Sequence, residues 1–591
     1  MTKPFSSSRK TGVPESSAGA AAADTAESSL TGASAFAERS WSGADLLAAA
    51  VLLLAVLLLG GRDLGVGGLG WSDAPHHVFD GIFLYELAQE AVRGGRGWLD
   101  LEAWRSWAEQ FYIRFPAIGI FVYWPPGFSA VEAAVFGLFG VSVGAARATV
   151  LLFAFGAVLL MYRLGLRWFD RPSGLLAALL LLTCPHGVLW LNDVMLEWPA
   201  TFWLLLAVWL YQVARDRPSR WRAAGWGATL VLAFLTKQTA VFIGPVLVGH
   251  ALLTRDGRRW LRRPAVLGSL TVAAGLVAAY LAASRPVTAL VPHLVRPAPD
   301  FLFYPGHLPE IIGWPLLPLV LLGTVTLVRR VDRGCRGLLL LWLGAWTAFC
   351  SVISAREPRY FFFALPPLAF AAVRFLTQPA AGGEPGLSVR RRDLGRWSLL
   401  SALVLCQTAL AWRGGTGRLP SYGPAVAELT RRADADLVLV DAVRDGQFVL
   451  DVYLDPDARR RLVPLRASKL LYARAARMQY APEVFVETTE DIVALLDRYG
   501  IRYIVIESVL PRTPYLDADP PPRRLLRRLL AEDPRFRQIA AWPLRCGDPI
   551  WDEVQLRLYA YPGCPPRTEK TITLSFPAMG REVRFELPER P

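Results

Sequence analysis

Charged residues are scarce in this sequence. Asp, Glu, Lys and Arg together make up 19% of its 591 residues, whereas hydrophobic types make up 53%, and the mean hydropathy is +0.32. Soluble domains average about 25% charged residues, so these values argue against a wholly soluble fold. Apolar runs of about 20 residues, long enough to cross a bilayer, recur from Leu46 to Ala411. We therefore predict a polytopic α-helical membrane protein.

The first 43 residues lack the large apolar side chains that a packed core needs. They are rich in Ser, Ala and Gly and cannot offset the entropy cost of ordering, so residues 1–43 are predicted to be a disordered cytoplasmic tail. The run Leu46 to Gly61 has neither a short basic segment before it nor an A-x-A cleavage site nearby. A retained first span is therefore favoured over a cleaved signal peptide.

About eleven apolar runs are predicted to cross the membrane as helices. They are Leu46 to Gly61, Ala148 to Leu166, Gly174 to Leu191, Trp198 to Ala214, Ala223 to Leu235, Thr239 to Leu253, Ala265 to Ala283, Ile311 to Val328, Gly337 to Ile353, Tyr360 to Phe375 and Trp397 to Ala411. A further run, Ser129 to Gly140, would invert every later loop if it also crossed. We expect it to lie along the outer membrane surface as a juxtamembrane helix.

Arginine clusters separate many of these runs and orient the chain. They are Arg163/Arg167/Arg171, Arg215/Arg217/Arg220/Arg222, Arg255/Arg258/Arg259/Arg262/Arg263, Arg329/Arg330/Arg333/Arg336 and Arg390/Arg391/Arg392/Arg396. Short cytoplasmic loops hold an excess of Lys and Arg, so the five clusters are predicted to share the cytoplasmic side. The net charge of +14 then faces anionic membrane lipids, and no nucleic-acid partner is expected.

This orientation predicts three parts. Residues 1–43 form the tail, residues 44–412 a membrane domain whose first external loop is 62–147, and residues 413–591 an external, periplasmic domain. The last part alternates apolar strands with amphipathic helices, which indicates an α/β fold. Asp441 and Asp445 follow one strand end, but no phosphate loop or nucleotide fingerprint accompanies them in this domain. An accessory or acceptor-binding role is therefore favoured for it.

The predicted external loops collect the residues with chemical potential. They are Asp73, His76, His77 and Asp80 in the first loop, Asn192, Asp193 and Glu197 in the second, Lys237 in a tight turn, and Arg356, Glu357, Arg359 and Tyr360 in a late one. Acids and bases are thus expected around one common surface.

Five short segments in these loops carry a resemblance to a known superfamily. They are Trp71-Ser-Asp73, Tyr123-Trp-Pro-Pro-Gly127, Asn192-Asp-Val-Met-Leu-Glu197-Trp-Pro199, Leu235-Thr-Lys237-Gln and Arg356-Glu-Pro-Arg359-Tyr360. Their order and predicted side resemble the GT-C superfamily of membrane glycosyltransferases, and more closely its bacterial protein mannosyltransferase and aminoarabinose transferase group. The resemblance implies a GT-C fold with juxtamembrane helices in the first external loop. It also implies transfer of a sugar from a polyprenyl-phosphate carrier.

The resemblance also implies that an acidic residue of the first external loop acts as base. Asp73 occupies the matching position. A carboxylate suits the chemistry, because an acceptor hydroxyl that attacks an anomeric carbon must lose its proton. Asp73 is therefore the predicted general base.

The leaving polyprenyl phosphate needs positive charge near the membrane surface. Lys237, Arg356 and Arg359 are predicted to bind this phosphate. Lys237 is the more informative, because a lone lysine between two apolar helices is costly unless it meets an anion or snorkels to the head groups. For the arginines, an interfacial anchor or a salt bridge with Glu357 is the alternative.

The first-loop cluster is also a candidate divalent-metal site. On a helix, Asp73, one of His76 and His77, and Asp80 would share one face, and carboxylates with imidazole suit Zn or Mn better than Mg. Alternatively, the histidines orient Asp73 or contact the donor phosphate.

Asp80, Asp193, Glu197 and Tyr360 are predicted to support the active site or the acceptor. Asp193 and Glu197 are four residues apart and would share one helix face. The alternative is a helix cap formed by Asn192 and Asp193, with a solvated Glu197.

Two points stay open. Among the six cysteines, Cys546 and Cys564 fall in the external domain and could form a disulfide in an oxidising compartment. The alternative function is a transporter or flippase of a lipid-linked or other polar substrate, which should show charged or broken helices in mid-membrane and internal repeats. Neither feature is found in the sequence. The sugar and the acceptor, whether protein, lipid or glycan, are not specified.

Overall fold

The computed structural model describes residues 41–71, 73–94, 100–115, 124–288, 299–329, 334–353, 356–377, 387–413, 421–432, 434, 436–473, 483–509, 520–544, 551, 553–576 and 581–587. The chain divides into two units, residues 1–48 and 49–591, and the second is described below. The predicted tail at 1–43 falls almost wholly outside the described residues. Cys546 also lies outside them, so its predicted pairing with Cys564 stays a prediction.

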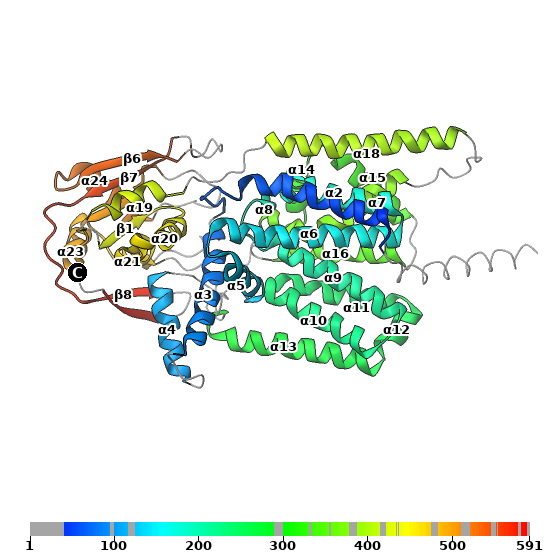
Figure 1. Ribbon diagram of the computed structural model, residues 1–591, viewed down its shortest axis with the longest axis horizontal. Coiled ribbons are helices and arrows are strands. Elements are labelled where there is room, and N and C mark those ends of the chain that lie inside the picture. Colours follow the sequence, from blue (N-terminus) through cyan, green and yellow to red (C-terminus); the bar gives the residue numbers. More distant parts are fainter. Residues whose placement is uncertain are drawn as a thin grey trace, which may run out of the picture. The chain divides into compact units, whose positions relative to one another are not determined.

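The described chain up to residue 413 is helical (Figure 1). Its helices are α2 (Gly43–Gly60), η2 (Gly61–Asp63), α3 (Ala74–Arg93), α4 (Leu101–Arg114), α5 (Gly127–Phe139), α6 (Val143–Trp168), α7 (Arg171–Thr183), α8 (Pro185–Leu191), α9 (Glu197–Asp216), α10 (Arg220–Thr236), η3 (Gln238–Phe242), α11 (Ile243–Leu253), α12 (Arg255–Leu261), α13 (Pro264–Thr288), α14 (Phe303–Ile312), α15 (Leu317–Arg329), α16 (Cys335–Val352), η4 (Pro358–Ala364), α17 (Leu365–Thr377) and α18 (Leu387–Arg413).

Each of the eleven predicted spans contains a helix, but the count of full-length spans is lower. Among the described residues, α2, α6, α13 and α16 are long and apolar enough to cross a membrane. The pair α7 and α8, bent by 68° where Pro185 begins α8, would make a fifth. The other predicted spans coincide with helices that are shorter, broken or more polar. The predicted count of eleven is therefore not confirmed, and the absence of broken helices predicted for this chain is wrong at α7–α8.

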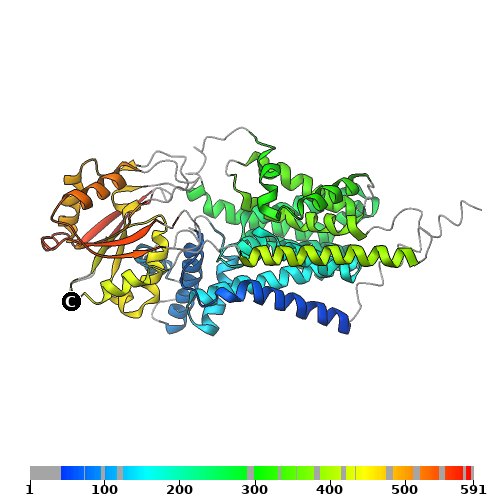
Figure 2. The ribbon, with the colours of Figure 1, turned by 90° about the horizontal axis from the view of Figure 1, so that it is seen from above.

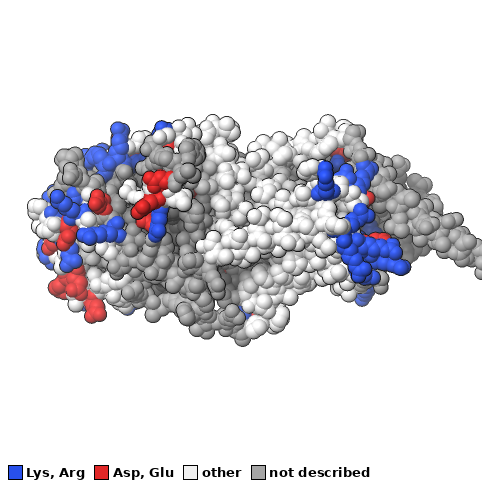
Figure 3. Space-filling view, turned by 90° about the horizontal axis from the view of Figure 1, so that it is seen from below, with Lys and Arg blue, Asp and Glu red and all other residues white. Residues whose placement is uncertain are grey.

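The arginine-rich loops meet at one end of the helix bundle, which we call the basic end. Arg167 Nε donates to Gln212 Oε1 (2.8 Å), and Arg215 Nη1 donates to the Tyr211 hydroxyl (3.0 Å), which contacts His250 Nδ1 (2.9 Å). On the face in Figure 3, Lys and Arg gather at the end where α12 lies, and a broad uncharged surface adjoins them. The predicted common side is thus confirmed for the first three arginine clusters.

The other end of the bundle holds the segments predicted to be external, and we call it the site end. Helix α9 runs from Glu197 towards the basic end, and α10 returns and ends at Thr236, one residue before Lys237. The two helices pack side by side, as do α6 with α9 and α10 with α13. Glu197 and Lys237 are therefore placed beside each other, far from the arginine loops.

The predicted juxtamembrane helix is α5, which packs against α3 and α6. Its first residue, Gly127, lies against the end of α10: a Cβ at this position would be 2.8 Å from the Leu235 carbonyl oxygen. Only glycine permits that approach without displacing backbone. The segment Tyr123 to Gly127 thus meets the segment that contains Lys237, although Tyr123 itself lies outside the described residues.

The chain after residue 420 forms a mixed sheet with helices on both faces (Figure 2). Its elements are α19 (Gly423–Thr430), β1 (Leu437–Asp441), α20 (Asp445–Leu454), α21 (Pro456–Arg461), β2 (Val463–Arg466), α22 (Ala467–Leu470), β3 (Tyr472–Ala473), β4 (Glu483–Val484), α23 (Thr489–Tyr499), β5 (Tyr503–Glu507), α24 (Pro521–Glu532), β6 (Arg537–Pro543), β7 (Gln555–Ala560), β8 (Thr571–Phe576) and β9 (Arg581–Glu586).

The five-stranded sheet has the order β2-β1-β5-β7-β6. Strand β1 pairs in parallel with β2 and β5, whereas β7 is antiparallel to β5 and β6. Parallel strands that are covered on both faces are nearly continuous apolar runs. Strand β1 is buried at every residue and is apolar up to its last residue, Asp441. Asp441, at the end of this strand, forms an ion pair within the same part of the chain: its Oδ1 lies 2.7 Å from Arg523 Nε.

Candidate functional site

Asp73 and Arg359, 286 residues apart, meet at the site end. Asp73 is the N-cap residue of α3, and its Oδ2 accepts a hydrogen bond from Arg359 Nη1 (3.1 Å). Arg359 Nε lies 2.5 Å from Glu357 Oε2, and its guanidinium lies 5.3 Å from the centroid of the Trp71 ring. The buried guanidinium of Arg359, in the last of the five segments, therefore contacts Asp73 and Trp71 in the first.

The surroundings of Asp73 keep its carboxyl group ionised. Burial raises the pKa of Asp73, but the positive charge and the hydrogen bond of Arg359 oppose this effect, and the pKa is held below its usual value. An ionised carboxylate is the form that can accept a proton. The Asp73 side chain is 29% exposed, which leaves it reachable from outside.

Lys237 and Glu197 form a second ion pair beside the first. Lys237 Nζ donates to Glu197 Oε1 (2.6 Å), and the Glu197 side chain is fully buried. The ammonium also lies 5.5 Å from the ring centroid of Tyr360, and the Arg359 guanidinium lies 5.4 Å from the same ring. Two of the three predicted phosphate-binding cations, Lys237 and Arg359, therefore lie near the Tyr360 ring. The alternative of a solvated Glu197 is not what the structure shows, because this side chain is fully buried.

His77 is a neutral side chain in this site. Burial lowers the pKa of His77 to about 3, even though Asp73 and Glu197 favour its charged form. Its ring packs edge-on against Trp124 (centroids 4.6 Å apart). At neutral pH His77 can therefore hydrogen-bond a ligand, but it adds no positive charge to the site.

Asp193 holds the backbone that leads to Asp73. Its Oδ1 accepts from the amide of Gly70 (3.1 Å) and its Oδ2 from the amide of Trp71 (2.6 Å). Burial raises the pKa of Asp193, and the amide of Gly70 together with the charge of Arg147 opposes the rise. Asp193 supports the site through backbone contacts, and it does not cap a helix at Asn192.

The predicted metal ligands are not grouped as a metal centre. No cluster of three or more His, Cys, Asp or Glu side chains that could hold a metal ion occurs among the described residues, which include Asp73, His76, His77 and Asp80. Asp73 is engaged by Arg359, and Asp80 is buried between helices. The quartet therefore does not fit a divalent cation, and we derive no step through one.

Asp80 lies between α3 and α5 with a second carboxyl group, Glu132, and both side chains are fully buried. Neither oxygen of Glu132 has a hydrogen-bond partner among the described residues, and the side chain packs where a Cβ at Gly81 would otherwise lie. Burial, together with the charge of Asp80, raises the pKa of Glu132 well above its usual value. The surroundings of Glu132 therefore favour its neutral, protonated form.

A pH-dependent stability follows from Glu132. An acid whose folded pKa is raised stabilises the fold below its unfolded pKa, and this stability is lost as pH rises through the folded pKa. Glu132→Gln replaces the titratable carboxyl group by a neutral amide of the same shape. Its melting temperature should therefore fall less than that of the wild type above about pH 5, by about 2–4 °C for each kcal/mol. Thermal melts across pH test this. Exposed Glu102→Gln is the control, and identical wild-type and Glu132→Gln curves would contradict it.

Arg356 lies in the same late segment as Arg359, three residues earlier, and its phosphate-binding role stays a prediction. Sequence reasoning missed Arg147, whose buried guanidinium donates to the carbonyls of Val66 and Gly68. Four glycines between residues 65 and 70 were the available signal, because a glycine-rich loop before Asp73 needs partners for its exposed backbone.

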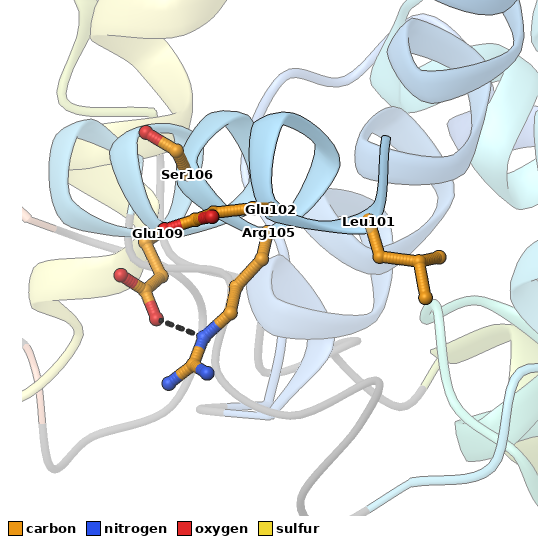
Figure 4. A pocket seen from close by; sticks show the side chains of 5 residues that line it. All are labelled: Leu101, Glu102, Arg105, Ser106 and Glu109. Carbon is orange, nitrogen blue, oxygen red and sulfur yellow. Dashed lines mark hydrogen bonds and ion pairs between the residues drawn. The ribbon is translucent and has the colours of Figure 1, made fainter. Parts of the chain in front are cut away.

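A cavity of about 500 Å³ lies elsewhere, along α4 (Figure 4). Its described lining is Leu101, Glu102, Arg105, Ser106 and Glu109. Arg105 Nε donates to Glu109 Oε1 (3.1 Å) within this lining. None of the predicted site residues contributes to it.

The chain resembles known proteins over its membrane part and in its fold. A family model described as dolichyl-phosphate-mannose-protein mannosyltransferase matches residues 124–282. This range includes Trp124, Asp193 and Lys237 but neither Asp73 nor Arg359. A curated relative, the undecaprenyl phosphate-alpha-4-amino-4-deoxy-L-arabinose arabinosyl transferase 1 of Pseudomonas fluorescens, is 30% identical over 306 residues, which are 47% of this chain and 52% of the relative. The match thus spans about half the length of that relative.

Among solved structures, the fold is similar to that of ArnT from Cupriavidus metallidurans. The crystal structure with undecaprenyl phosphate bound gives a TM-score of 0.56 at 14% identity, covering 88% of this chain and 99% of that one. The apo structure of the same protein gives a TM-score of 0.53 at the same identity and coverage. At this identity the likeness concerns the fold, and it extends over nearly the whole of the solved chain.

Proposed function

We propose that this chain, which has the GT-C fold of membrane glycosyltransferases, transfers a sugar from a polyprenyl-phosphate carrier to an acceptor hydroxyl or related group. The predicted resemblance to the GT-C superfamily is confirmed by the family-model match and by the fold. The reaction is proposed for the outer face of a bacterial cytoplasmic membrane, because the site end lies opposite the arginine-rich loops. The donor class is the one named for the similar proteins.

The observation that carries the proposal is the meeting of one ionised acid and two cations at the site end. Asp73 lies 3.1 Å from Arg359, and Lys237 faces the same Tyr360 ring as Arg359. A carboxylate that accepts a proton and cations that stabilise a leaving phosphate are what the transfer needs. All of these groups come from segments far apart in the sequence.

The proposed reaction is a single displacement at the anomeric carbon of the donor sugar. The acceptor oxygen forms a bond to the anomeric carbon while its proton passes to Asp73. The bond from that carbon to the phosphate oxygen breaks, and its electron pair stays on the polyprenyl phosphate. Arg359 and Lys237 stabilise the developing negative charge. Arg359 is shared with Asp73 before the donor binds, so the donor phosphate competes with Asp73 for this guanidinium.

A transporter or flippase of a lipid-linked substrate is the second candidate function. The observation that favours it is the break between α7 and α8, because transporters often bind substrate at broken helices. The ion pairs Asp73–Arg359 and Lys237–Glu197, however, lie at helix ends and not in mid-helix. This position is the one expected of a site that acts at the membrane surface.

The test is transfer of labelled sugar from a panel of polyprenyl-phosphate donors, using membranes with and without the protein. Incorporation that depends on the protein and on one donor supports the transferase and identifies the sugar. Chelation by EDTA, followed by return of Mg, Mn or Zn, decides in the same assay whether a divalent ion is needed. Absence of incorporation with every donor, together with movement of the lipid-linked sugar between leaflets, would establish the transporter instead.

A further inference from the structure

The loop Leu64–Trp71, which leads from the first helix to Asp73, has no regular secondary structure. Four of its eight residues are glycines, so few side chains are available to fix its shape. Buried backbone amides and carbonyls outside helices and sheets need other partners. In this loop the partners are side chains from three distant parts of the chain.

The membrane part of the chain supplies the first two sets of partners. Arg147, near the start of α6, donates to the carbonyls of Val66 and Gly68. Asp193 accepts from the amides of Gly70 and Trp71, as described above. These contacts hold the loop on both sides of Leu69.

The third set comes from α20 and its N-cap residue, Arg444, in the sheet-containing part of the chain. Gln447 Oε1 accepts from the amide of Leu69 (3.2 Å), and Arg444 Nη1 donates to the carbonyl of Leu69 (3.0 Å). Gln447 is fully buried, and its Nε2 is oriented by Asp451 Oδ1 (2.8 Å). The backbone amide and the backbone carbonyl of Leu69 are therefore both hydrogen-bonded by side chains that come almost 380 residues later in the chain.

Further contacts fasten α20 and the following helix, α21, to α3, the helix that Asp73 caps. Gly446 lies beside the His76 imidazole, 3.4 Å from where its Cβ would be. The Tyr453 hydroxyl and Arg459 both contact Glu86, farther along α3. The sheet-containing part thus contacts the membrane part at two places, at Leu69 in the loop and at Glu86 on α3.

We infer that Arg444 and Gln447 are positioning residues, which hold the loop Leu64–Trp71 and thereby place Asp73 for proton transfer. This inference rests on the proposed transferase function and gives the sheet-containing part a role in it. A general base must lie within hydrogen-bond reach of the proton it removes. A displacement of about 1 Å can lower the rate on the order of 10²-fold, so release of Leu69 should affect turnover more than donor binding.

The test uses the full chain and five variants. Gln447→Leu and Arg444→Met remove the contacts to Leu69, whereas Arg444→Lys keeps a donor and a positive charge. Tyr453→Phe is the matched control, because it weakens the docking on α3 without touching the loop. Glu86→Gln is a second control at the same place. Melting temperatures of all variants are compared first, and the Leu69 amide is then followed by hydrogen–deuterium exchange of the peptide that contains it.

Gln447→Leu and Arg444→Met should exchange at Leu69 about tenfold faster than the wild type. Their kcat should fall by about tenfold or more with the donor KM within about twofold, and Arg444→Lys should recover most of the loss. Tyr453→Phe and Glu86→Gln should change neither the exchange rate at Leu69 nor kcat. Unchanged exchange in Gln447→Leu overturns the inference. Faster exchange with unchanged kcat overturns its catalytic part. A wild type that transfers nothing refutes the transferase, and exchange alone then decides whether α20 holds the loop.

Discussion

Asp73→Asn should lower sugar transfer by about 10²–10⁴-fold, the usual contribution of a general base. The amide has the shape of the carboxyl group but cannot take the acceptor's proton. Arg359 keeps Glu357 as a partner in this variant, so no unpaired charge is created at the site. Donor binding and melting temperature should therefore stay close to those of the wild type. The measurement is kcat with saturating donor and acceptor, alongside donor affinity.

Glu357→Gln is the matched control for Asp73→Asn. It removes the other carboxylate that Arg359 contacts and leaves the predicted base in place. Its transfer rate should stay within about tenfold of the wild type, because the lost partner is not part of the proton transfer. If Asp73→Asn retained a rate as high as Glu357→Gln, Asp73 would be one end of a structural ion pair and not the base.

Lys237→Met should reduce both stability and transfer. The ammonium is the hydrogen-bond partner of the fully buried Glu197, and removing one member of a buried pair costs about 3–5 kcal/mol. The same change removes a positive charge from the place where the phosphate leaves, which lowers the rate by about 10²–10³-fold. Thermal stability and kcat report the two effects separately.

The double variant Lys237→Met/Glu197→Gln separates stability from chemistry. With both charges removed, no ionised carboxylate is left buried, and most of the lost stability should return. Transfer should stay low, because the positive charge is still missing. A double variant that regains transfer together with stability would show that Lys237 is a structural residue.

The location of the site residues at one end of the helix bundle could be predicted from the sequence, because it depends on the topology of the chain. Asp73, Glu197, Lys237 and Arg359 occupy connections that the arginine-rich loops place on one side. Helix length then fixes the distance between the two ends of the bundle. The sequence did not indicate the pairing of these residues, because hydrogen-bond partners 40 and 286 residues apart leave no local pattern.

Other parts of the site could not be predicted from local signals. Glu132 lies in an apolar run, and its raised pKa depends on Asp80 of another helix. The link from Gln447 to Leu69 joins residues 378 apart, and nothing in an amphipathic segment specifies what its polar side chains will contact. Pro185 is a local signal for the break between α7 and α8, because proline has no backbone N–H to donate within a helix. The continuous apolar run nevertheless led us to predict one span.

The most direct test of the account uses the purified protein in liposomes with the donor identified in the membrane assay. The amount of free polyprenyl phosphate and the amount of sugar on the acceptor are measured in the same samples. The account predicts one polyprenyl phosphate released for each sugar transferred, with both lost in Asp73→Asn. Intact donor that moves between leaflets without release of polyprenyl phosphate would contradict it.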